Sequence, residues 1–151
     1  MALWDNLKQR SQDMNAQLKT QASKFKNKDF ANASMAMCAL LAAADGKIDA
    51  EERRKVAGLI GSNDVLSIFE ASDLRDNFER YCTKLTSDFD FGKLECIQAI
   101  SKLKAKQDQA RAVIQIGIII GGADGNFDAD ERAVVKEACF AVGIAPTEFD
   151  L

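Results

Sequence analysis

Six carboxylates, arranged in two matching sets, are the side chains of this sequence best suited to binding chemistry. Residues 44–56 and 123–135 lie 79 positions apart and are identical at eight of thirteen aligned positions. Each segment presents two aspartates and a glutamate in the same order, and the six acids are Asp45, Asp49, Glu52, Asp124, Asp128 and Glu131. Hard divalent cations prefer carboxylate oxygens. The pattern therefore makes a calcium or magnesium site the first candidate chemistry.

Comparison with a calcium loop of the EF-hand type limits this interpretation. When Gly46 and Gly125 are aligned with the invariant glycine of such a loop, the acids that follow occupy ligand positions in its second half. The positions that should supply the first ligands hold side chains without oxygen, which are Leu41, Ala43, Ile120 and Gly122. Neither segment can be an ordinary EF-hand. An ion must be shared between the two turns or completed by other groups.

The same acids also have a structural explanation. In each segment, the second aspartate and the glutamate three residues later have the spacing of a helix capping box. Such a cap stabilises a helix by about 1 kcal/mol. Asp-Gly favours a tight turn, and Ile48 and Phe127 are expected to point into the core. Capping therefore leaves over Asp45 and Asp124, together with the surplus acids Glu51 and Asp130. Asp45 and Asp124 are the pair that most favours binding over architecture.

Charge is distributed unevenly along the chain. Residues 1–28 carry six cations against two acids, a net charge of +4, which leaves −7 for residues 29–151. The two acidic turns account for that whole excess, so we expect no nucleic-acid partner. The alternative to a metal site is a metal-free interaction module whose acidic patch docks a basic partner.

Catalysis is not expected. The sequence contains no histidine, which excludes a histidine base, a catalytic triad and histidine-ligated zinc. Four isolated cysteines, each within an apolar run, are predicted to be buried free thiols: Cys38, Cys82, Cys96 and Cys139. Carboxylates in capping positions are not an acid/base pair, so the chain is predicted not to be an enzyme.

Hydrophobic periodicity predicts an all-α fold of about seven helices. Strong helix formers dominate residues 30–44, preceded by a cap at Asn27–Asp29. Residues 110–122 suit a strand as well as a helix, but they occupy the equivalent position in the repeat, so we interpret them as the central buried helix. A second helix follows each acidic turn, at 49–60 and 128–142. The core is thus a duplicated helix-turn-helix.

Shorter helices are predicted around this repeat. They are expected at 65–69, from a cap at Ser72 to residue 85, and from a cap at Asp88 or Asp90 to residue 103. Gly143 should end the 128–142 helix, and Pro146 should start a short final one. The apolar stripe expected to face the core in the helix before residue 103 is Leu94, Ile97, Ile100 or Ser101, and Leu103.

The N-terminal segment, residues 1–28, is weakly amphipathic and basic, and residues 29–151 form the predicted helical domain. We expect no signal peptide, because the first thirty residues contain no unbroken apolar stretch. The longest apolar run, 113–123, is too short to span a bilayer. We therefore expect a cytoplasmic protein. Trp4 and the lysines of the segment suit peripheral membrane association, and the alternative is a partly frayed helix or a tail that docks on the domain or stays mobile.

The two Ala-Asp-Gly-x-(Ile/Phe)-Asp-Ala-x-Glu segments, their separation and the chain length resemble the TerB family of tellurite resistance proteins. The resemblance implies an all-helical fold of two overlapping four-helix arrangements, with the acidic turns as divalent-cation sites. It also implies a bacterial stress operon associated with tellurite resistance, phage inhibition and colicin tolerance. The implied partners are the membrane protein TerC and other tellurite-operon proteins, at the inner face of the membrane.

Overall fold

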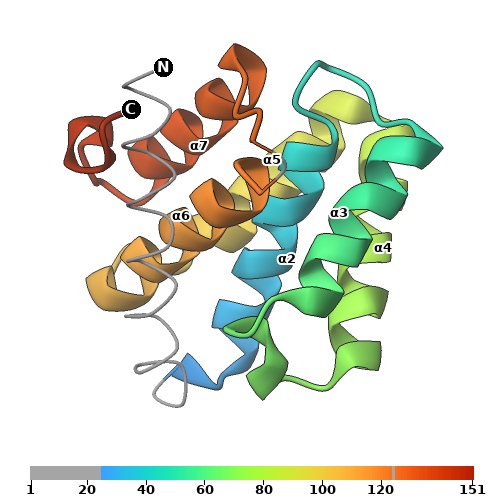
Figure 1. The fold of residues 1–151 in the computed structure, drawn as a ribbon. Coiled ribbons are helices and arrows are strands. Elements are labelled where there is room, and N and C mark those ends of the chain that lie inside the picture. The colour runs from blue at the N-terminus through green and yellow to red at the C-terminus, as the bar shows by residue number, and fades with distance from the viewer. Residues whose placement is uncertain (1–24, 124) are drawn as a thin grey trace.

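Figure 1 shows the fold in a computed structural model, which describes residues 25–123 and 125–151. Most of the N-terminal segment, residues 1–24, and the acid Asp124 lie outside the described residues. The described chain contains six α-helices and two 3₁₀ helices and no strand, so the all-α prediction is confirmed. These are α2 (Lys28–Ala42), α3 (Ala50–Ser62), η2 (Leu66–Ile68), α4 (Ala71–Ser87), α5 (Phe89–Ser101), α6 (Gln107–Gly121), α7 (Ala129–Ala141) and η3 (Pro146–Phe149).

Helix α2 is the central helix of the fold. It contacts α3, α4, α5, α6 and α7, and every residue from Ala33 to Ala43 is buried. Its alanines let the surrounding helices approach closely. The prediction that residues 110–122 form a helix is confirmed, but the prediction that this helix is the central one is wrong. Helix α6 is largely buried, yet the small side chains of α2, not the bulky ones of α6, allow packing on all sides.

The helices fall into two groups of four that share α2 and α5. In the first group α2, α4 and α5 pack against one another and α3 packs on α2 and α4. In the second, α7 packs on α2, α5 and α6, and α6 also packs on α2 (Figure 1). This is the overlapping arrangement that the family resemblance implies. No helix within the described part of the chain combines the length and apolar character that crossing a bilayer requires.

Several helix ends follow from local sequence signals. The Asn27 side chain accepts a hydrogen bond from the Phe30 amide at 2.9 Å, and Asp88 does the same for Phe91 at 3.1 Å, so both caps are as predicted. Gly143 has φ +72°, and the amide that follows it donates to the Cys139 carbonyl at 2.9 Å. This is the Schellman arrangement expected at a terminal glycine.

Two local predictions are wrong. Helix α4 begins at Ala71, so Ser72 lies inside its first turn and does not cap it. In α5, Leu94 is 51% exposed, whereas Gly92 is buried. A Cβ atom on Gly92 would lie 2.6 Å from the Leu85 amide nitrogen, which means that α5 presses its backbone against α4. Hydrophobicity alone predicts that Leu94 faces the core, because it gives no weight to a glycine whose backbone makes the contact.

Candidate functional site

The two acidic turns share one backbone geometry. Gly46 has φ +97° and Gly125 has φ +82°, values that glycine adopts readily and other residues rarely do. The Gly46 amide donates to the Ala43 carbonyl at 3.0 Å, and the Gly125 amide donates to the Gly122 carbonyl at 3.1 Å. Each glycine therefore reverses the chain in the same way between a buried helix and the helix that follows it.

The aspartates after these turns cap α3 and α7. An Asp49 carboxylate oxygen accepts from the Glu52 amide at 2.8 Å, and an Asp128 oxygen accepts from the Glu131 amide at 2.8 Å. Only in the second turn does the glutamate side chain also take part, because Glu131 accepts a hydrogen bond from the Asp128 amide at 3.2 Å. The predicted caps are confirmed, while the complete reciprocal box is present at α7 and only its aspartate half at α3.

An aromatic ring anchors the second turn to the core. Phe127 is only 8% exposed, and a Cβ atom on Gly121 would lie 2.9 Å from its ring. Glycine at the end of α6 therefore makes room for the ring. Ile48, the equivalent residue in the first turn, is half-buried and packs against the same core. Both side chains thus point inward as predicted, and both turns are held against the bundle.

The structure brings the two turns together around one cleft of about 190 Å³. They lie at the same end of the bundle, although they are far apart in the sequence (Figure 1). The cleft is formed by the end of α2, both turns and the first turns of α3 and α7. Its acidic lining residues are Asp45, Asp49, Glu52, Asp128, Asp130 and Glu131. Five of the six predicted site residues therefore meet here, and Asp124 lies outside the described residues.

Three polar lining residues are not among the predicted site residues. Asp130 and the amide of Asn126 add oxygen donors, and Lys55 is the only cationic side chain among the described residues that line the cleft. Asp130 could be found from the sequence, because it follows the α7 cap by two residues. Lys55 could not, since its place at the cleft depends on how α3 packs.

The electrostatics of the cleft favour a cation. Six carboxylates face one ammonium group, and the N-termini of α3 and α7 point toward the same space. A helix N-terminus stabilises nearby negative charge by about 0.3–1 kcal/mol, so the fold tolerates this crowding. One oxygen of Asp45 also accepts from the Lys47 amide at 3.3 Å. Each capping carboxylate retains a second oxygen that its backbone hydrogen bond does not use.

The donor set fits calcium or magnesium, because it consists of carboxylate and amide oxygens without histidine or cysteine. The described side chains do not, however, form a closed cage: within 25–123 and 125–151, no three acidic or sulfur-bearing residues are placed to hold one metal ion. Water or backbone carbonyls would have to complete the coordination of an ion in this cleft.

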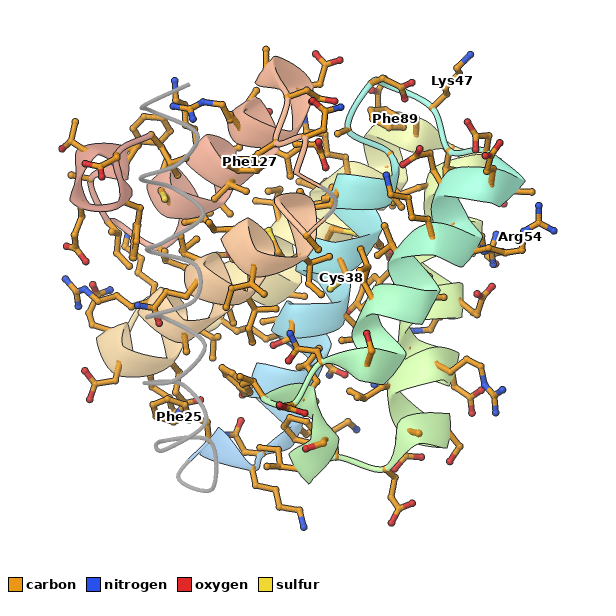
Figure 2. All side chains as sticks on the ribbon, viewed as in Figure 1. Phe25, Cys38, Lys47, Arg54, Phe89 and Phe127 are labelled. Carbon is orange, nitrogen blue, oxygen red and sulfur yellow. The ribbon has the colours of Figure 1, made fainter. Side chains whose placement is uncertain are left out.

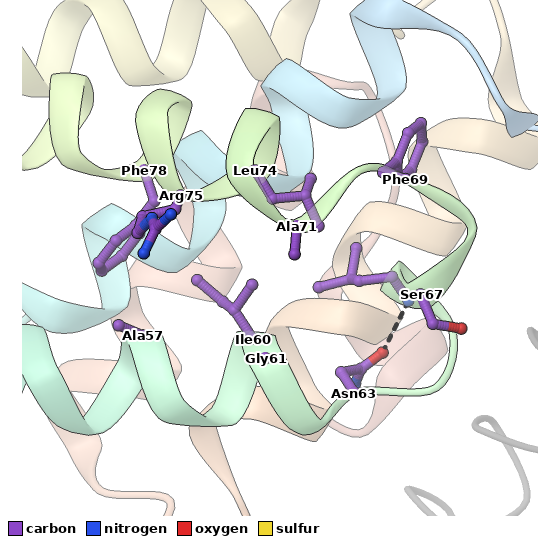
Figure 3. Close-up of a pocket in the computed structure, with 11 residues that line it drawn as sticks. Ala57, Ile60, Gly61, Asn63, Ser67, Phe69, Ala71, Leu74, Arg75 and Phe78 are labelled. Carbon is purple, nitrogen blue, oxygen red and sulfur yellow. Dashed lines mark hydrogen bonds between the residues drawn. The ribbon is translucent and has the colours of Figure 1, made fainter.

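A second hollow, between α3, η2 and α4, has a volume of about 280 Å³ (Figure 3). Apolar side chains such as Ile60, Leu74 and Phe78 line it, and Arg75 is the only charged residue among the described residues that line it. The Asn63 side chain at its rim accepts from the Leu66 amide at 3.1 Å, so that oxygen belongs to the turn. This hollow lacks the groups that a cation or acid/base chemistry needs.

The thiols are removed from chemistry by burial, as predicted. All four cysteines are free and buried, and Figure 2 shows Cys38 inside the bundle while Lys47 and Arg54 point outward. Burial is the largest cause that raises the pKa of Cys38, Cys82 and Cys96 to about 12, and that of Cys139 to about 11. Neutral, inaccessible thiols neither reduce substrates nor bind metals.

Comparisons with known proteins agree with the resemblance carried by the two turns. The model of a family described as tellurite resistance protein TerB matches residues 31–151, a range that includes both turns and the cleft. A relative from an Alcaligenes species, named tellurium resistance protein TerB, is 28% identical over 118 residues, which cover 78% of this chain and 97% of the relative. No solved structure matches the chain.

Proposed function

Because the chain belongs to the TerB family of tellurite resistance proteins, we propose that it is a non-enzymatic resistance protein that binds a divalent cation in the cleft between its two acidic turns. The observation that carries this proposal is the convergence of six carboxylates from two separate turns on one small cleft. A single half-loop lacks ligands, whereas two half-loops around one cleft would offer carboxylates from both sides, with water or backbone carbonyls completing the coordination.

The residues proposed to hold the ion are Asp45, Asp49, Glu52, Asp124, Asp128 and Glu131. Asp124 is included from the sequence alone, by analogy with Asp45. Asp49 and Asp128 would cap their helices with one oxygen and face the cation with the other. When bound, a calcium or magnesium ion would neutralise part of the mutual repulsion of the acids and tie the two turns together. Tellurite itself undergoes no reaction in this scheme.

A second function uses the same cleft without metal. Three of these acids, Asp49, Asp128 and Glu131, have structural duties in helix caps, and the combined charge of the set is complementary to a basic segment of a partner protein. In that case the cleft would be a docking surface. The two functions are distinguishable because only the first predicts saturable binding of a free ion.

We further place the protein in the cytoplasm, close to the inner face of the membrane, where it would act with TerC and other tellurite-operon proteins. The family resemblance supports this placement, and the basic character of residues 1–28 suits peripheral association with anionic lipid. Roles in phage inhibition and colicin tolerance belong to the same proposal, and the resemblance is their only support.

The test compares thermal stability with and without calcium. Asparagine caps a helix about as well as aspartate but lacks its charge, so Asp49→Asn with Asp128→Asn should leave the Tm of the metal-free protein near that of the wild type. Millimolar calcium should raise the Tm of the wild type clearly and that of the variant much less. If calcium and magnesium leave the wild-type Tm unchanged and calorimetry detects no saturable heat, cation binding is wrong and the docking function gains support.

A further inference from the structure

A hollow of about 270 Å³ lies between α4 and α5, and it is chemically opposite to the acidic cleft. Helix α4 contributes Arg80, Tyr81 and Lys84, and α5 with its C-terminal cap contributes Glu95, Gln98 and Lys102. Three of these side chains are cations and one is an anion. The protein as a whole has a net charge of −3, and cation binding at the acidic cleft does not explain why positive side chains gather here.

The positive charge is only partly neutralised by the protein. Lys84 forms an ion pair with Glu95 at 2.8 Å. Arg80 and Lys102 have no carboxylate partner among the described residues that would offset their charge. The lining therefore keeps two uncompensated positive charges, which attract anions most strongly at low ionic strength.

The arrangement also offers directed hydrogen-bond donors. Arg80 and Lys84 lie one turn apart on α4, so their side chains leave the same face of the helix. The Arg80 guanidinium carbon lies 5.1 Å from the centroid of the Tyr81 ring, a contact that limits where the guanidinium can move. The Gln98 amide and the Lys102 ammonium face the hollow from α5. An anion could thus receive hydrogen bonds from both helices.

We propose that this hollow binds a small inorganic oxyanion. The planar guanidinium fork of arginine matches two oxygens of such an ion, and the two lysines add point charges around it. Phosphate and tellurite share this chemistry. Glu95 limits the affinity, because its carboxylate occupies Lys84 and repels the ligand. The proposal is independent of cation binding at the acidic cleft.

The test is a titration of the full-length protein, followed by amide chemical shifts at low ionic strength, with sodium phosphate and sodium tellurite in separate arms. We expect saturable shifts for Arg80, Tyr81, Gln98 and Lys102 at millimolar ligand. Equal affinities would identify a general oxyanion site, and tighter tellurite binding would assign the site to that ion.

Matched variants separate a site from general charge attraction. Arg80→Gln with Lys102→Gln should weaken binding at least tenfold, while Arg54→Gln with Lys136→Gln, which removes the same charge from exposed positions elsewhere, should change it less than twofold. Glu95→Gln should tighten binding severalfold. Equal losses in both double variants, an absence of saturation, or shifts that follow protein concentration rather than ligand would overturn the proposal. The last result would indicate that a second copy of the chain occupies the hollow.

Discussion

Burial of all four cysteines limits the redox chemistry that the protein can carry out. The ordinary thiol pKa of 9.0 rises to about 12 for Cys38 because the interior disfavours a thiolate. At neutral pH, all four thiols stay protonated and shielded. Resistance by thiol reduction of an oxyanion would need the reverse, an exposed thiolate, so the proposed mechanism does not use these residues.

A pH dependence follows from these thiols. The pKa of each thiol is higher in the folded protein than its ordinary value of 9.0 in the unfolded chain. The thiols therefore leave the free energy of unfolding unchanged well below pH 9.0. They lower it as the pH rises from there toward the folded-state values of about 11 to 12, because only the unfolded chain then releases the protons. One pH unit above the ordinary value, each buried thiol should lower the free energy of unfolding by about 1.4 kcal/mol.

Urea unfolding at a pH below 9.0 and at a pH one unit above it measures this drop in the free energy of unfolding. In Cys38→Ala the drop should be smaller by the contribution of one thiol, about 1.4 kcal/mol. Equal stability at the two pH values would contradict the buried assignment. So would labelling of the native thiols at the rate of a model thiol.

At the scale of elements, α4 and α5 approach so closely that Gly92 is required. Alanine at this position would place its Cβ 2.6 Å from backbone of α4, so Gly92→Ala should destabilise the protein by about 1–3 kcal/mol or more. Gly58 in α3 offers the matched control. A Cβ atom there would meet only open space, and φ is not positive, so Gly58→Ala should stabilise by about 0.5–1 kcal/mol. Urea unfolding measures both, and changes of the same sign would contradict the packing described.

Local signals explain which elements can be predicted. Asn27, Asp49, Asp128 and Gly143 act through hydrogen bonds to residues within five positions, so the sequence pattern contains all the information needed. The strand-like run before the second turn is assignable as a helix only because the repeat supplies a helical counterpart. The buried face of α5 cannot be predicted from hydrophobicity, because Gly92 lies on that face without a side chain and allows the close approach of α4.

The candidate site requires information that spacing does not hold. Each turn is recognisable from its own residues, but their convergence depends on α2 packing beside α6 and on the direction in which α3 and α7 leave. Asn126 and Lys55 enter the lining for the same reason. Long-range packing of this kind leaves no periodic mark in a single sequence.

At the scale of the whole molecule, the cleft lies where the two four-helix groups meet. Helix α3 packs in one group and α7 in the other, and each begins at the cleft with a capping aspartate. Under the proposed function, a cation shared between the turns would therefore couple the two groups. Two complete loops would bind two ions independently, whereas two half-loops need each other.

The stoichiometry of calcium binding, measured by isothermal titration calorimetry on the full-length protein, shows whether the two turns form one shared site. A shared site predicts one ion per chain. It also predicts that Asp45→Asn in the first turn and Asp128→Asn in the second each weaken that single binding event by at least severalfold, because both acids line the cleft and belong to the proposed ligand set. Two independent ions per chain, or one ion whose affinity responds to only one of the two variants, would show that the turns do not act as one site.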